Sequence, residues 1–126
     1  MNDAELNKIS KQGLNWVKDN LKFYRIGPST IEVETPLIDA FGQKIYCFIM
    51  KQDEGYRVSD DSWMLYKLDP MQEDEDFQEA AQDIVLGSGF DYDDQTGEIF
   101  QDVTYAELAM MVNNLAQLEV ALSFIK

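Results

Sequence analysis

Apolar residues recur every three to four positions in three stretches of the chain, which is the spacing of one face of an α-helix. The first stretch begins after Asp3, a residue type that caps helices, and continues to about Lys22. The second covers about residues 72–86 and ends at Gly87, and the third runs for about twenty residues from Thr104. We therefore predict an N-terminal, a middle and a C-terminal helix, each with one apolar face.

Between the first two helices, apolar residues alternate with polar ones, as they do in β-strands. Residues 29–38 and 56–59 show this alternation, whereas residues 44–52 are apolar on both alternating faces. A strand of the latter kind is typical of the centre of a sheet that is covered on both sides. Turns containing Gly42 and Gly55 separate the three runs, so we predict a three-stranded antiparallel meander.

Further along the chain, residues 90–93 and 98–103 predict a second, shorter hairpin, and the aromatic-rich residues 63–68 predict a short helix. Pro36 has no amide hydrogen, which places its strand at an edge of the sheet or at a bulge. There is no repeat and no flexible linker. The sequence thus predicts one domain, residues 1–126, with an α+β fold: an antiparallel sheet, made of the meander and the hairpin, packed by the three long helices.

Charge is distributed very unevenly along the chain. The whole sequence has 24 acidic and 10 basic residues, a formal net charge of −14. Residues 53–107 contain seventeen of the acids and only two of the bases, a net charge of −15. Such a field repels nucleic acid and anionic membranes, and it attracts basic protein surfaces or cations. The alternative is that the charge only keeps the protein soluble.

Several kinds of catalytic site are absent from the sequence. Histidine does not occur, which removes the usual general base near neutral pH and the Ser–His and Cys–His pairs. Cys47, the single cysteine, lies in the most apolar strand and is expected to be buried and inert. Asp91, Asp93 and Glu98 surround a glycine, but their spacing does not fit a calcium loop, and a hairpin turn is the simpler interpretation. We therefore expect no enzyme, no cofactor and no metal site.

The same composition bears on where the protein works. A single cysteine allows no disulfide within the chain, and the polar N-terminus does not resemble a signal peptide. No apolar run approaches the roughly 20 residues that span a bilayer. These features predict a cytoplasmic protein.

Carboxylates gathered on a helix and a hairpin can imitate a row of phosphates and occupy the nucleic-acid groove of a partner. Glu73, Asp76, Glu79 and Asp83 recur at three- and four-residue spacing, which would place them in one stripe of the middle helix. Successive carboxylates in such a stripe are roughly 5–6 Å apart, close to the spacing of phosphates along a strand.

The pair Asp60-Asp61 precedes Trp63 and Tyr66, so it could form a contact patch in which aromatic side chains anchor a partner and acids steer it. The structural alternative is that one aspartate caps the short helix and the other is merely exposed. Taken together, the candidate partner-binding residues are Asp60, Asp61, Glu73, Asp74, Asp76, Glu79, Asp83, Asp91, Asp93 and Asp94.

Two motifs between about residues 29 and 70 are similar to a known family. They read Thr35-Pro36-x-x-Asp39-x-x-Gly42 and Gly55-Tyr56-x-Val58-Ser59-Asp60-Asp61-x-Trp63-x-Leu65-Tyr66-x-Leu68. They resemble a family of bacterial and prophage domains of unknown function, in which a TP..D..G strand pair is followed by a DDG-aromatic turn. This chain has Ser62 where the family usually has glycine, and a serine would be strained if the turn requires a positive φ there. The resemblance implies an α+β fold and a phage or mobile-element setting, and it implies no catalytic residue.

These observations lead to one principal hypothesis and two alternatives. The principal one is a non-enzymatic acidic binding protein in a bacterial host cytoplasm, similar in kind to anti-CRISPR and anti-restriction proteins. Its partner would be a protein with a basic nucleic-acid-binding surface, such as a CRISPR or restriction nuclease, whose DNA or RNA site it occludes. The first alternative is a regulatory or adaptor module that associates with itself, for instance as a homodimer, through exposed aromatics. A carboxylate–metal hydrolase is the second.

Overall fold

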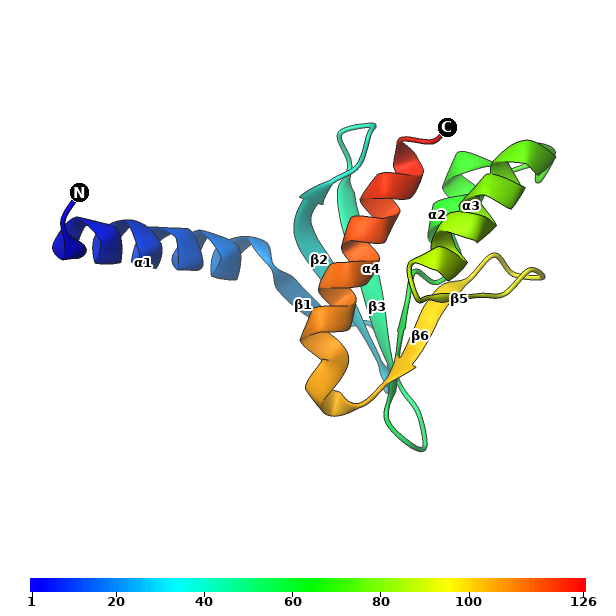
Figure 1. Ribbon diagram of the computed structural model, residues 1–126. Helices are drawn as coiled ribbons and strands as arrows, with labels where there is room; N and C mark the ends of the chain where they lie inside the picture. Colours follow the sequence, from blue (N-terminus) through cyan, green and yellow to red (C-terminus); the bar gives the residue numbers. More distant parts are fainter.

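The computed structural model describes residues 1–126 and shows one antiparallel sheet with helices packed against it (Figure 1). The six strands are arranged in the order β1-β2-β3-β4-β6-β5. Along the chain the elements are α1 (Asp3–Asn20), β1 (Lys22–Arg25), β2 (Thr30–Ile38), β3 (Lys44–Lys51), β4 (Tyr56–Ser59), α2 (Trp63–Leu68), α3 (Glu75–Gly87), β5 (Asp91–Tyr92), β6 (Ile99–Val103), the 3₁₀ turn η1 (Tyr105–Glu107) and α4 (Leu108–Ser123). The predicted α+β class is confirmed.

The strands form one continuous sheet. The predicted meander is β2–β3–β4, and the predicted second hairpin is β5–β6, which joins the meander because β6 pairs with β4. Strand β1 was not predicted: the first helix was expected to continue to Lys22, but it ends at Asn20 and the next four residues pair with β2. Pro36 lies where the β2–β3 register shifts, so it marks a bulge rather than a sheet edge.

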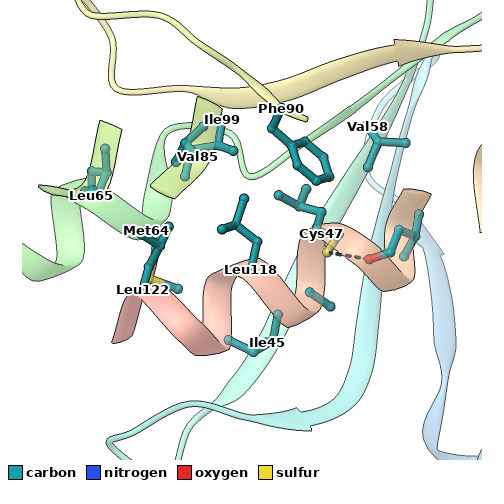
Figure 2. Packing of buried hydrophobic residues seen from close by; sticks show 14 of the residues in the cluster. Ile45, Cys47, Val58, Met64, Leu65, Val85, Phe90, Ile99, Leu118 and Leu122 are labelled. Atoms are coloured by element: carbon teal, nitrogen blue, oxygen red, sulfur yellow. Dashed lines mark hydrogen bonds between the residues drawn. The ribbon is translucent and has the colours of Figure 1, made fainter. Parts of the chain in front are cut away.

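The hydrophobic core lies between one face of the sheet and the helices α2, α3 and α4. Alternate residues of neighbouring strands, among them Val58 and Ile99, are fully buried in this core. Figure 2 shows Leu118 and Leu122 of α4 and Met64 of α2 pointing into the same cluster. Because each strand turns alternate side chains to this face, the helices bind the sheet through one continuous apolar layer.

The other face of the sheet is only partly covered. Tyr46, Phe48 and Met50 of β3 point away from the core and are half-buried, so the expectation that β3 would be covered on both sides is wrong. Aromatic side chains tolerate this position because their polar or π faces can meet water or a cation. Arg57 illustrates the point, since its guanidinium lies 3.9 Å from the centre of the Phe100 ring.

Helix α1 projects away from the sheet and contacts it near its C-terminal end, where it adjoins β2 (Figure 1). Its predicted apolar face exists, but none of the eighteen residues of the helix is buried. The position of the helix was therefore predicted correctly, whereas its apolar stripe has no partner within the chain.

Candidate functional site: an acidic surface and an aromatic groove

The turn from β4 to α2 is built around the carboxylate of Asp60, which is fully buried. Its Oδ1 accepts hydrogen bonds from the amides of Ser62 and Ile99, both at 2.9 Å, and its Oδ2 accepts one from the amide of Met64 at 3.1 Å. The prediction that Asp60 belongs to a contact patch is wrong, because a buried carboxylate with three amide donors cannot reach a partner. The structural alternative holds: Asp60 caps the start of α2, and Asp61 is exposed.

Three titratable groups in the core have shifted pKa values. Burial raises the pKa of Asp60 to about 6, although its three amide donors favour the ionised form. Burial also raises the pKa of Glu119 on α4 well above its ordinary value. The Glu119 carboxyl accepts a hydrogen bond from the Cys47 thiol at 3.4 Å. Burial and this neighbouring carboxyl raise the pKa of the thiol as well, so Cys47 is the buried, unreactive cysteine that the sequence predicted.

The chain has three non-glycine residues with positive φ: Asp61 at 55°, Ser62 at 63° and Gln72 at 53°. The left-handed conformation costs a non-glycine residue about 1 kcal/mol and persists only where the surroundings enforce it. The strain expected at Ser62, which replaces the usual glycine of the family motif, is thus confirmed. All three residues line a single groove.

This groove, of about 370 Å³, lies between α2, the residues that follow α2, and the β5–β6 hairpin. Trp63 and Tyr66 of α2 lie in its wall with ring centroids 6.0 Å apart, and they are 55% and 60% exposed. The half-buried Tyr92 of β5 and the carboxylates of Asp61 and Asp94 also line it. We call it the aromatic groove. Aromatic faces and carboxylates together are the groups that bind guanidinium and ammonium ions.

Asp76, Glu79 and Asp83 lie on the outward face of α3, opposite its buried residues, as their spacing predicted. Glu73 does not belong to this stripe, because α3 begins at Glu75 rather than at residue 72. The helix starts late since the positive φ of Gln72 and the caps that precede α3 keep residues 69–74 in an irregular loop. Glu73 is nevertheless exposed in that loop.

Two further candidates have structural roles. Asp74 is the N-cap of α3: it accepts the Phe77 amide at 3.0 Å and pairs with Lys126 at 2.6 Å. The hydrogen bond from Lys126, followed by that from the amide, lowers the pKa of Asp74. Asp93 accepts the amide hydrogens of Gln95 and Thr96 and so closes the β5–β6 turn. Both carboxylates are thereby partly engaged within the chain.

The remaining seven candidates are exposed, and their carboxylates form no hydrogen bond or ion pair within the chain. We refer to them as the acidic surface: Asp61, Glu73, Asp76, Glu79, Asp83, Asp91 and Asp94. They come from α3, the loop before it, the β4–α2 turn and the β5–β6 hairpin. Figure 1 places α3 and the hairpin on the side of the molecule that is remote from α1.

Sequence reasoning missed Tyr92 and Gln72 as members of the aromatic groove. Tyr92 follows the buried Phe90 at strand spacing, which indicates that both side chains point to the same face of the sheet, and Tyr92 accordingly pairs with the buried Ile99. Gln72 carries no signal, since glutamine has no preference for positive φ. The groove exists because α2 and a hairpin some thirty residues later approach each other, and local spacing does not report such an approach.

The residues that carry the family resemblance stabilise turns and connections of the fold. The Thr35 hydroxyl donates a hydrogen bond to the Ile45 carbonyl at 2.8 Å and so clips β2 to β3. Asp39 accepts two amide hydrogens of its own turn and forms an ion pair with Lys67 of α2. Gly42 completes this turn with a φ of 79°. The ion pair ties the first motif to the second, which gives both motifs a structural role.

Fold and surface together define an acidic α+β domain with seven exposed, unpaired carboxylates. Residues 35–122 match the family described as Domain of unknown function DUF1828, and the chain belongs to this family. Comparison with curated proteins and with solved structures found no match. The matched region begins within β2, so α1 and β1 lie outside it.

No group of three or more aspartate, glutamate or cysteine side chains is arranged to hold a metal ion. None of the helices combines the length and the apolar character that crossing a membrane requires.

Proposed function

We propose that this protein is a non-enzymatic binding protein whose acidic surface docks on the basic, nucleic-acid-binding surface of another protein. The observation that carries the proposal is the set of seven exposed carboxylates without partners in the chain. Like charges at helical spacing destabilise a helix by a few tenths of a kcal/mol per pair. A partner with lysine and arginine side chains would remove that repulsion and gain charge-assisted hydrogen bonds.

The aromatic groove supplies the second element of the proposed interface. Trp63 and Tyr66 are more than half exposed although they lie next to the core residues of α2. Large aromatic side chains at such positions are typical anchors of protein interfaces, and surrounding charges accelerate association. In the docked state, an arginine or lysine of the partner would lie against these rings and between Asp61 and Asp94.

The biological role that we propose is inhibition of a host-defence nuclease of the restriction or CRISPR type, by occlusion of its DNA or RNA site. The support is the resemblance to prophage domains together with the small size and the net charge of −14. Such an inhibitor would act in the cytoplasm of a bacterial host. It needs no catalytic residue, because a bound acidic surface excludes nucleic acid sterically and electrostatically.

The test is affinity capture from bacterial lysate at low and at high salt, with the bound proteins identified by mass spectrometry. We expect a nuclease or another nucleic-acid enzyme, which is released by high salt and displaced by DNA. A partner that stays bound at high salt, or that DNA does not displace, would contradict occlusion by charge.

Matched double variants then locate the interface on the protein. The variant Glu79→Lys/Asp83→Lys reverses two charges of the acidic surface, and Asp53→Lys/Glu54→Lys reverses two exposed charges in the β3–β4 turn. Both change the net charge equally, but only the first should abolish binding, while the melting temperatures of both stay near that of the wild type. Equal losses of binding would show that only net charge matters. Unchanged binding of the first variant at low salt would overturn the proposal.

A further inference from the structure

Helix α1 has an apolar stripe without any partner in the chain. Leu6, Ile9, Trp16 and Val17 recur at helical spacing and are between 43% and 54% exposed. In proteins most of the stability of a helix comes from packing of its amphipathic face, and Gly13 lowers the intrinsic stability of this helix. The stripe therefore requires a surface to pack on.

The chain's own sheet does not provide that surface. Leu21 is the only residue between the end of α1 and the start of β1, whereas connections between helices and strands usually have two to six residues. One residue does not let the chain reverse direction, and α1 accordingly leads away from the sheet in Figure 1. Short connections of this kind favour exchange of the element between two copies of a chain.

A matching apolar surface lies at the β1–β2 edge of the sheet. Phe23 pairs with Val33 and therefore points to the same face of the sheet, the face that carries the core. Ile31 pairs with the buried Ile49 and also points to that face. Yet Phe23 is 59% and Ile31 is 38% exposed, because α4 packs over β2, β3, β4 and β6 and leaves this edge open.

Charge complementarity supports a second copy of this chain as the occupant of the stripe. Residues 1–26 contain five basic and three acidic residues, a net charge of +2, whereas residues 27–126 contain five basic and 21 acidic residues, a net charge of −16. The N-terminal segment is thus attracted to the remainder of a second copy.

We propose that two copies of the chain exchange their α1 helices. The N-terminal half of α1, which reaches furthest from its own sheet, packs Leu6 and Ile9 against Phe23 and Ile31 of the second copy. The same contact occurs twice about a two-fold axis, so the assembly closes as a dimer. The inference goes beyond the docking function and does not depend on it. The acidic surface lies remote from α1 and stays free in the dimer. The dimer therefore presents two acidic surfaces.

The first test is the oligomeric state of the full chain, measured by sedimentation over a range of concentrations. We expect a dimer for the wild type. Ile9→Asp should be a monomer, with a dimer dissociation constant at least tenfold higher than that of the wild type. The matched control is Asn15→Asp, which introduces the same side chain on the opposite face of α1 and should remain dimeric. A wild type that is monomeric at every concentration would overturn the proposal, as would equal effects of the two variants.

The second test distinguishes helix exchange from pairing of two α1 helices with each other. Ile9→Cys and Ile31→Cys are prepared separately and then mixed under mild oxidation, with the wild type as a control because Cys47 is buried. Exchange predicts a disulfide-linked dimer in the mixture and little in either variant alone. Cross-linking of Ile9→Cys with itself, without an additional product in the mixture, would show that the helices pair with each other and that exchange is wrong.

Discussion

Replacing Glu119 with glutamine should remove much of a pH dependence that is built into the core. Glu119 is 1% exposed, its carboxylate bonds to the Cys47 thiol, and burial raises its pKa well above the ordinary value of 4.5. The folded protein therefore keeps this proton at pH values where the unfolded chain has lost it. The stability from this group is fully present below pH 4.5 and is lost as the pH rises through the pKa of the folded state.

The magnitude follows from linkage. Between pH 4.5 and the pKa of Glu119 in the folded state, the free energy of unfolding falls by about 1.4 kcal/mol for each pH unit. For 126 residues, an unfolding entropy of about 2.1 cal/mol/K per residue converts this into a melting temperature about 5 °C lower per pH unit. Asp60, with a pKa of about 6, adds a contribution of the same sign, which is common to the wild type and to Glu119→Gln.

The assay is thermal unfolding followed by circular dichroism between pH 5 and 7 at constant ionic strength. The wild type should lose stability as the pH rises, and Glu119→Gln should lose distinctly less, since glutamine does not titrate. Glu79→Gln, on the exposed face of α3, removes one carboxylate without changing the core and should retain the wild-type slope. If the melting temperatures of the wild type and Glu119→Gln fall equally with pH, Glu119 is not the source of the pH dependence.

Three further substitutions and one labelling experiment test other parts of the structure. Asp60→Ala leaves three amides without an acceptor and should lower the free energy of unfolding by about 3 kcal/mol or more in urea titrations. A loss below about 1 kcal/mol would contradict the capping role of Asp60. Ser62→Gly should raise the free energy of unfolding by about 1 kcal/mol, because glycine accepts a φ of 63° without strain. A decrease would contradict the strain assigned to Ser62. Gly55→Ala should destabilise the hairpin, since the added Cβ would lie 2.7 Å from the Val103 carbonyl oxygen, and an unchanged melting temperature would show that the turn relaxes. Cys47 should react with a thiol reagent only as fast as the protein unfolds, so rapid native labelling would disprove its inertness.

The sheet was predictable where local signals are strong. The spans of β2, β3 and β4 agree with the prediction to within a residue, because alternating side chains and the turns at Gly42 and Gly55 define them locally. The start of the C-terminal helix at Thr104 was also predicted, and in the structure Thr104 and Glu107 form a capping box there. The first turn there is 3₁₀, which sequence spacing does not distinguish from α.

What could not be predicted depends on contacts between distant segments. Strand β1 has all four residues exposed, so it lacks the buried alternation that reveals a strand and exists only through its pairing with β2. Asp60 and Asp61 are adjacent and chemically identical, yet the amide of Ile99, from a distant strand, decides which of them is buried. The apolar stripe of α1 was evident in the sequence, but periodicity does not tell which surface a stripe packs on.

The separation of charge along the molecule has a consequence for how it would meet a partner. The acidic surface and the N-terminal segment, residues 1–26 with a net charge of +2, lie toward opposite sides of the chain, so a single copy is an electric dipole as well as a polyanion. In the field of a basic protein, a torque turns the acidic side forward before any contact is made, which raises the fraction of productive collisions. At physiological ionic strength this alignment acts only within about 8 Å, the Debye length, and added salt would therefore slow association by randomising the approach.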